Sequence, residues 1–327
     1  MLPPLSDLLA TARVVDLPLA SRFRALTSRE ALLVEGPEGW SEFSPFAEYN
    51  DAEAAHWLAA TVDFGWQPAP PALRQAIPVN ATLPAVSPDE VAAVLDRFGR
   101  CRTVKVKVSE PGQVLSEDVA RVAAARDYVG AEGRIRIDAN GGWNIDEAEH
   151  AIHALAGFDL EYVEQPCATI DELFELRSRV KYMGIPIAAD ESVRTASDPL
   201  LVARSGAADV LVLKAQPLGG VRAAMAIASE AELPVVVSSA LDTGVGLSMG
   251  LQLAASVPQL EFDCGLATSA LFIDDVSDDR PLPVNGSIEV RRIAPTPRLL
   301  DQHAATPERR DWWLARLTRC YALLARR

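Results

Sequence analysis

The sequence predicts an α/β protein built around a (β/α)₈-type barrel, and three observations lead to this class. A short apolar strand, a polar break and an amphipathic helical pattern recur from about residue 78 to residue 266. Strands that alternate with helices are typical of βαβ units and a parallel sheet. Eight strand candidates are more than a modest open sheet holds and suit a closed barrel. A doubly wound sheet is the alternative, but no Gly-x-Gly-x-x-Gly motif follows the first strand.

The repeating elements can be assigned to residue ranges. The predicted strands are 78–83, 103–109, 134–140, 161–166, 186–192, 210–216, 234–240 and 260–266. The helical patterns between them are 115–129, 144–158, 170–183, 198–207, 221–233 and 245–257. In the second of these, Ala148, Ile152, Leu155 and Phe158 keep helical spacing on one face. We expect that face to pack against the sheet.

The segments on either side of the repeat have a different pattern. Residues 1–77 hold two hydrophobic runs, a turn signal in "GPEGW" and a helical stretch near residues 51–65, which together indicate a small α+β domain. The tail after about Pro283 ends in a helical segment with Trp312, Trp313 and Leu317 at near-helical spacing. We expect this helix to pack on the body of the protein.

The composition excludes several classes of function. The 327 residues are 49% hydrophobic and carry a formal net charge of −14, which argues against a general nucleic-acid or anionic-membrane surface. Cys101, Cys167, Cys264 and Cys320 have no paired spacing, which indicates buried thiols in a reducing, cytoplasmic setting rather than disulfides or zinc ligands. We expect neither a secretory signal nor a membrane span, because no basic region precedes the first apolar residues and no apolar run approaches about 20 residues.

Charged residues end successive strand candidates, about one per repeat. They are Lys107, Asp138, Glu164, Asp190 and Lys214. In a barrel such positions surround one mouth, where active sites lie. Three carboxylates in apolar surroundings repel one another and lose hydration, and a divalent cation removes both problems. Oxygen-only ligands select a hard ion, so the three acids predict a Mg²⁺ site, with Mn²⁺ as a substitute.

Each acid also has an ordinary structural interpretation. Asp138 could be a turn residue or a helix N-cap, and Glu164 could simply end a strand. Asp190 could cap the next helix, with Glu191 as the ligand instead. The regular recurrence of three acids between strand-borne lysines favours the metal site.

The stretch "TVKVKV" alternates lysines with valines. Lys105 and Lys107 therefore share one face of a strand. That face is solvated in an ordinary exposed strand, but it points inward in a barrel whose valines face the helices. A lysine beside a bound cation should have a lowered pKa, and a neutral lysine is a competent base. The pattern predicts removal of a proton next to a carboxylate, with the metal stabilising the enediolate that forms.

The same residues match a known pattern in order. The Lys-x-Lys of residues 105–107, "DANGGW", "EQP", "DES" and "LKAQPLGG" resemble the enolase superfamily in its muconate-lactonising subgroup. Within it the chain is most similar to the o-succinylbenzoate synthases of actinobacteria, in residues 23–49, 134–144, 238–247 and 264–276. Gly244 and Ala267 depart from the pattern, and both lie in expected substrate loops.

The resemblance implies a modified (β/α)₇β barrel at residues 78–283, under an α+β capping domain at residues 1–77 onto which residues 284–327 pack. It implies a Mg²⁺-dependent lyase that dehydrates SHCHC (2-succinyl-6-hydroxy-2,4-cyclohexadiene-1-carboxylate) to o-succinylbenzoate in menaquinone biosynthesis. In this reaction Lys107 would take the α-proton and then protonate the leaving hydroxyl. Lys214 would stabilise the intermediate as a cation. Lys105 would hold the substrate carboxylate.

The resemblance also implies substrate contacts. These residues are Arg136, Asn140, Ser238, Ser239, Gly265 and Leu266 in the barrel, and Phe23, Arg24, Ser44 and Phe46 in the capping domain. We expect a small carboxylate substrate and no nucleic-acid or membrane partner; a monomer is plausible, and the oligomeric state stays open.

Two other functions remain as alternatives. An N-acylamino acid racemase or dipeptide epimerase would use the same two lysines. Such an epimerase needs an acidic anchor for the substrate amine, for which Asp242, Asp263, Asp274 and Asp275 are candidates. A non-catalytic barrel is the third reading, but buried charges without a function are costly.

Overall fold

Seven parallel strands form the central sheet, in the order β11-β10-β9-β8-β7-β6-β5. The computed structural model describes residues 2–23, 26–194 and 198–326. Within them the strands of this sheet are β5 (Ala81–Leu83), β6 (Thr103–Lys107), β7 (Arg134–Asp138), β8 (Leu160–Glu164), β9 (Ile187–Ala189), β10 (Val210–Leu213) and β11 (Val235–Val237). Six of these strands lie inside predicted segments and β8 begins one residue before its segment of 161–166, so seven of the eight predicted strands are confirmed.

The eighth predicted strand, at residues 260–266, is not a regular strand. Cys264 and Gly265 instead form single parallel bridges with Val79 and Ser238. The backbone N–H of Cys264 donates to the carbonyl of Pro78 at 2.7 Å, and that of Gly265 donates to the carbonyl of Val237 at 2.8 Å. These bridges connect the two edges of the sheet and close the barrel.

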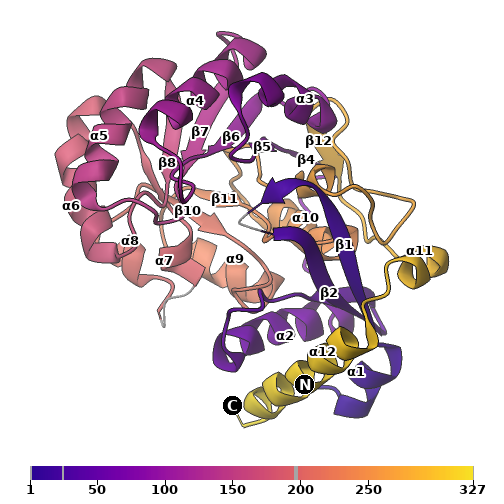
Figure 1. Cartoon of the computed structure of the whole chain (residues 1–327). Coiled ribbons are helices and arrows are strands. Elements are labelled where there is room, and N and C mark those ends of the chain that lie inside the picture. Colours follow the sequence, from indigo (N-terminus) through magenta and orange to yellow (C-terminus); the bar gives the residue numbers. More distant parts are fainter. Residues whose placement is uncertain (1, 24–25, 195–197, 327) are drawn as a thin grey trace.

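Helices cover the outer face of the sheet (Figure 1). They are α3 (Val91–Leu95), α4 (Leu115–Val129), α5 (Ile145–Leu155), α6 (Ile170–Val180), α7 (Glu191–Arg194), α8 (Leu201–Arg204), α9 (Val221–Glu230) and α10 (Gly244–Ser256). In α5 the side chain of Asn144 caps the first turn, and Ala148, Ile152 and Leu155 are buried as predicted. Phe158 follows the helix and is only partly buried. Burial of each large aliphatic side chain contributes about 1.5–3 kcal/mol.

The N-terminal part forms a separate antiparallel sheet of β1 (Arg13–Phe23), β2 (Leu26–Gly36) and β3 (Gly39–Phe43). Two helices accompany it, α1 (Leu5–Thr11) and α2 (Asp51–Trp66). The β1–β2 hairpin extends toward the barrel (Figure 1). We call the segment formed by β1, β2, β3 and α2 the cap.

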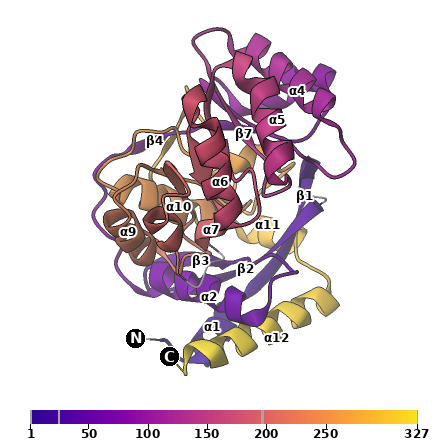
Figure 2. The same ribbon diagram turned by 90° about the vertical axis from the view of Figure 1, so that its left-hand side faces the viewer.

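The C-terminal tail returns to the cap. It contains β12 (Ser287–Glu289), which pairs with β4 (Ala76–Pro78), and then α11 (Pro297–Gln302) and α12 (Pro307–Leu324). Helix α12 runs beside α2 (Figure 2) and buries Trp313 and Leu317 in the same hydrophobic cluster. The expectation that this helix packs on the body is therefore confirmed, whereas the division at residues 77 and 283 stays a prediction.

Two further expectations can be compared with the structure. The four cysteines are free and buried. Among the helices that the structure describes, none combines the length and the apolar character that crossing a bilayer requires.

Candidate active site

The lysines of β6 both point into the barrel. Lys105 Nζ donates to both carboxylate oxygens of Glu164, at 2.8 and 2.9 Å, and lies 3.2 Å from Asp138 Oδ2. Lys107 Nζ lies 2.5 Å from Asp138 Oδ2 and donates to Asn140 Oδ1 at 2.8 Å. Both side chains are buried, while the alternating Val104, Val106 and Val108 join the core under the helices. The inward lysine face predicted from the alternation is confirmed.

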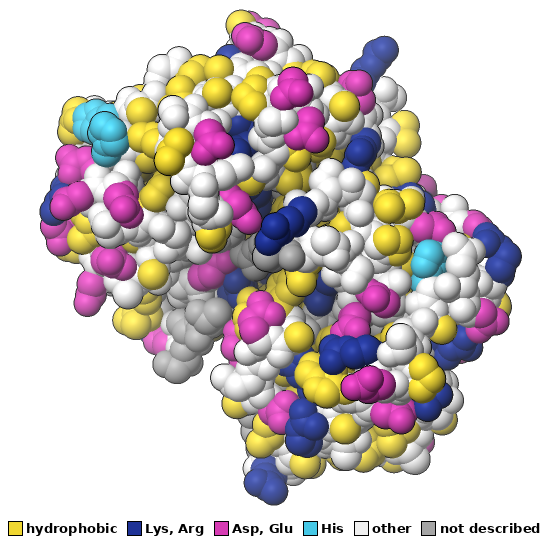
Figure 3. Space-filling model, viewed as in Figure 1, with side chains coloured by type: hydrophobic (Ala, Val, Ile, Leu, Met, Phe, Trp, Pro, Cys, Tyr) yellow, Lys and Arg dark blue, Asp and Glu magenta, His cyan; other side chains and the backbone are white. Residues whose placement is uncertain are grey.

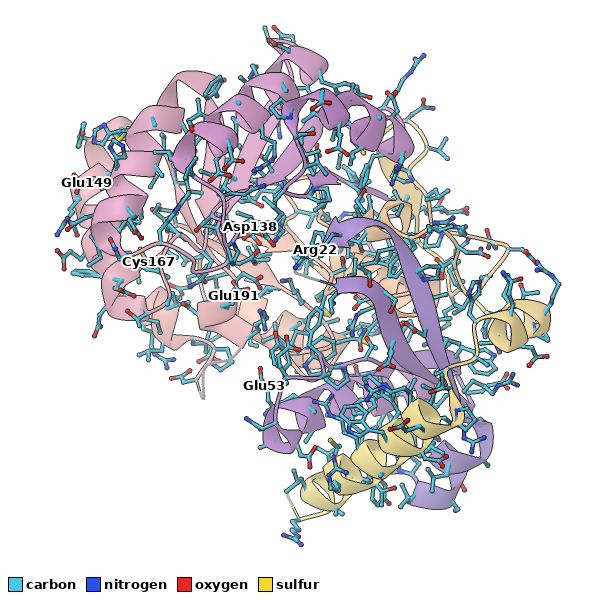
Figure 4. The ribbon with its side chains drawn as sticks, viewed as in Figure 1. Arg22, Glu53, Asp138, Glu149, Cys167 and Glu191 are labelled. Carbon is cyan, nitrogen blue, oxygen red and sulfur yellow. The ribbon has the colours of Figure 1, made fainter. Side chains whose placement is uncertain are left out.

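The register of the sheet sets the acids beside these lysines. Asp138 lies opposite Lys107 on one side and opposite Glu164 on the other. Asp190 follows β9, and Lys214, which follows β10, donates to its Oδ2 at 2.5 Å. Three carboxylates and three lysines thus surround the barrel mouth. In Figure 4, Asp138 lies in this mouth, facing the end of β1.

Electrostatic interactions couple the buried acids. Burial raises the pKa of Glu164, the charges of Asp138 and Asp190 raise it further, and Lys105 opposes them, so that the pKa reaches about 7. For Lys105, burial acts to lower the pKa, but the charges of Glu164 and Asp138 outweigh it and the pKa is raised. This direction is opposite to the lowered lysine pKa expected beside a cation, because in the structure the carboxylates pair with the lysine directly.

The oxygen atoms of the three acids are the ligand type that a hard cation prefers, although these acids pair with lysines in the structure. Among the described residues, no group of three or more His, Cys, Asp or Glu side chains is arranged to hold a metal ion. Asp138, Glu164 and Asp190 are nonetheless all buried oxygen donors. Asp190 Oδ1 accepts no hydrogen bond within the described part of the chain, although Arg194 Nε lies 3.4 Å from it as an ion-pair partner. A cation would take that oxygen as a ligand and would reduce the mutual repulsion of the acids. The donor set therefore fits a metal site, which stays a prediction.

A small cavity of about 30 Å³ lies over the lysines. Its walls are Phe23, Phe46, Thr82, Lys105, Lys107, Lys214, Ser238, Ser239, Ala240, Leu241, Gly265 and Thr268. A hollow of about 300 Å³ adjoins it through Phe23 and Lys107 and includes Arg22 and Asn140. Basic side chains are visible in the hollow at the centre of Figure 3. The ring of Phe23 lies 5.4 Å from Lys107 Nζ and so covers the amine from the cap side.

Sequence comparison assigns the chain to a family. Residues 14–65 match the enolase N-terminal domain-like model and residues 88–295 match the enolase C-terminal domain-like model. The chain is 52% identical to the o-succinylbenzoate synthase of Mycobacterium ulcerans, over 99% of this chain and 97% of that protein. It is 51% identical to the o-succinylbenzoate synthase of Mycolicibacterium smegmatis, over 98% of each chain. The chain belongs to the o-succinylbenzoate synthase family.

Solved structures confirm the enolase-like fold class of this family member. Muconate lactonizing enzyme from Pseudomonas putida matches with a TM-score of 0.73 at 19% identity, over 90% of this chain and 98% of that one. The L-Ala-D/L-Glu epimerase from Bacillus subtilis matches with a TM-score of 0.74 at 21% identity, over 87% and 96%. At such identities the likeness shows the fold alone, namely the modified barrel with a capping domain.

Most of the predicted site residues lie together in the structure. Besides the three lysines, the cavity wall contains Phe23, Phe46, Ser238, Ser239 and Gly265. Asn140 lies at the adjoining hollow and accepts a hydrogen bond from Lys107. Their contact with a substrate stays a prediction.

Three predicted substrate-contact residues of the described chain lie outside the cavity wall and the adjoining hollow. Arg136 is fully buried, and its guanidinium donates to Glu161, Asn80 and the carbonyl of Asp263 instead of lining the cavity. Leu266 is buried outside the cavity wall, and Ser44 donates to Glu42. Arg24 lies outside the described residues.

Sequence reasoning missed some residues of the cavity wall. Thr82, Leu241 and Thr268 line it but were not singled out. Thr82 had a detectable signal, because it lies two residues after Asn80 in a predicted strand, and residues two apart share one face of a strand.

Proposed function

We propose that this chain catalyses the dehydration of SHCHC to o-succinylbenzoate, the lyase step that the family resemblance places in menaquinone biosynthesis. The observation that carries the proposal is identity of about 50% with relatives named o-succinylbenzoate synthase, over nearly the full length of both chains. The lysines and acids at one barrel mouth support it, because the reaction needs a base and a stabiliser of negative charge next to a carboxylate.

Lys107 is the proposed base. It removes the proton on the ring carbon next to the carboxylate, and the resulting ammonium then protonates the departing hydroxyl on the same face. One C–H and one C–O bond break, a C=C bond forms in the ring and an O–H bond forms in the water that leaves. Lys107 lies under Phe23, which excludes bulk water from the amine.

The other charged groups act as fixed partners. Lys214 provides a cation toward the ring, and Lys105 holds the substrate carboxylate. Asp138, Glu164 and Asp190 would hold Mg²⁺, or Mn²⁺ as a substitute, which supplies positive charge to the substrate carboxylate as its negative charge grows. The charge of a bound cation would offset the carboxylate charges that raise the pKa of Lys105. We also infer a cytoplasmic enzyme that acts on a small carboxylate.

The decisive assay uses purified protein, SHCHC and Mg²⁺, and follows loss of the diene by ultraviolet absorbance. We expect turnover with Mg²⁺ and none in excess EDTA. Racemisation of N-acylamino acids is measured with the same protein by polarimetry. Rapid racemisation with SHCHC left intact would contradict the synthase proposal and favour the isomerase.

A further inference from the structure

A buried polar network joins the cap to the barrel beside the cavity. Its central residues are Arg29 on β2, Glu42 on β3, Gln216 after β10 and Asp242 after β11, and we call these four the cap latch. All four are almost fully buried, with exposed fractions of 0–5%. Gln216 is two residues from Lys214, and Asp242 is three residues from Ser239. The cap latch therefore contacts the two barrel loops that carry cavity residues.

Glu42 connects the cap to both loops. Its carboxylate accepts hydrogen bonds from the amide nitrogen of Gln216 at 3.1 Å and from the backbone N–H groups of Thr243 at 3.1 Å and Gly246 at 3.2 Å. The hydroxyls of Thr243 and Ser44 donate to it as well, each at 2.5 Å. Thr243 is the N-cap of α10 and Gly246 lies in its first turn, where a carboxylate is also favoured by the helix dipole.

Arg29 holds a different set of groups. Its guanidinium donates to the backbone carbonyls of Leu241 at 3.2 Å and Ala240 at 3.4 Å, which directly follow Ser238 and Ser239. It also lies 4.3 Å above the ring of Phe46, a cavity residue of the cap. Arg29 thus fixes the distance between Phe46 of the cap and residues 238–241, which we call the serine loop.

The charges of the network suit a positioning role. Gln216 donates to Glu42 and also to Asp242, at 3.0 Å, so one amide bridges two buried carboxylates. Burial raises the pKa of Glu42, and burial together with the charge of Glu42 raises that of Asp242 to about 7. A buried charged network is a weak source of stability compared with apolar packing of the same volume. Its directed hydrogen bonds do, however, fix the relative placement of the three segments.

We propose that the cap latch positions the catalytic cavity: Gln216 and Glu42 fix the Lys214 segment against the cap, and Arg29 fixes Phe46 against the serine loop. The kinetic part of this proposal rests on the proposed dehydration. Arg29, Glu42 and Gln216 are positioning residues, since the wall of the cavity over the lysines does not include them.

Two substitutions test the two parts of this proposal separately. Gln216→Met releases the Lys214 segment, so kcat should fall by about ten-fold or more while KM changes by less than about three-fold. Arg29→Met releases Phe46 and the serine loop, so KM should rise by about ten-fold with a smaller change in kcat. If both variants keep wild-type kcat and KM while only melting temperature falls, or if both show one common kinetic pattern, the proposal is overturned.

Arg222→Ala is the matched control, because Arg222 pairs with Asp63 of the cap away from the cavity. Both kinetic parameters should stay within about two-fold of wild type in this variant. If Gln216→Met does not fold, the double variant Gln216→Met/Asp242→Asn replaces it, since it also removes the buried charge that the amide serves. The same loss of kcat is expected there, and wild-type kcat would overturn the proposal.

Hydrogen exchange tests the latch without any substrate. Amides of residues 239–247 should exchange about ten-fold faster or more in Arg29→Met than in the wild type and Arg222→Ala. Unchanged exchange overturns the latch. If the wild type leaves SHCHC unchanged, the proposed function fails, and the exchange rates alone still decide whether the latch holds this loop.

Discussion

Gly246→Ala tests how tightly Glu42 is held at the first turn of α10. A Cβ at position 246 would lie 2.6 Å from the carboxylate carbon of Glu42 and 2.7 Å from each of its oxygens. Because carbon contacts are comfortable near 3.5 Å, Glu42 would have to retreat by about 1 Å. That movement loses at least one hydrogen bond to a charged group, at a cost of about 1.5–3 kcal/mol. Replacing a helical Gly by Ala offsets about 1 kcal/mol of this.

The expected net loss is about 0.5–2 kcal/mol, which lowers the melting temperature of a chain of 327 residues by roughly 1–3 °C. Thermal melting followed by circular dichroism measures it, together with urea unfolding. Gly157→Ala is the control, because nothing lies within 4 Å of a Cβ built there. A melting temperature for Gly246→Ala equal to or above that of the wild type would show that Glu42 can move without loss, and would refute the reasoning.

The remaining predictions concern the acids and the aromatic residues. Glu164→Gln should keep the fold but lose most activity and weaken Mn²⁺ binding, measured by titration calorimetry; full activity in excess EDTA would refute the metal role. Asp190→Asn should abolish cation binding and Glu191→Gln should not; the reverse result would make Glu191 the ligand. Phe23→Ala should cost more free energy in substrate binding, measured as a higher KM, than in unfolding, since this ring covers Lys107. A lower melting temperature with unchanged kinetics would make Phe23 an ordinary core residue. Phe46→Ala should raise KM but also cost about 3–5 kcal/mol of stability, because its ring packs in the aromatic cluster of the cap; an unchanged melting temperature would argue against that packing.

The barrel and the charged mouth were predictable because local patterns determine them. The alternation in β6 sends Lys105 and Lys107 to the face opposite the valines in any strand, and parallel strand ends must meet at one edge. One acid per repeat therefore converges once the barrel closes. These inferences need only the strand period and the βα repeat.

Features that depend on distant partners could not be predicted in this way. The segment at 260–266 has the composition of a strand, but only Cys264 and Gly265 pair with their neighbours. Arg136 shares the inward face of its strand, yet Glu161 and Asn80 hold its guanidinium away from the cavity. The contact of Glu42 with Thr243 joins positions 201 residues apart, and no local period reports such a pairing.

The central claim is that a single lysine, Lys107, moves the proton during dehydration. Its most direct test compares SHCHC turnover by Lys107→Ala and Lys214→Arg at saturating Mg²⁺. The account predicts that kcat falls by about 10³-fold or more in Lys107→Ala, which lacks the base. It predicts a smaller loss of about ten-fold in Lys214→Arg, which keeps the cation but transfers protons poorly. Equal losses in the two variants, or turnover that survives Lys107→Ala, would contradict the account.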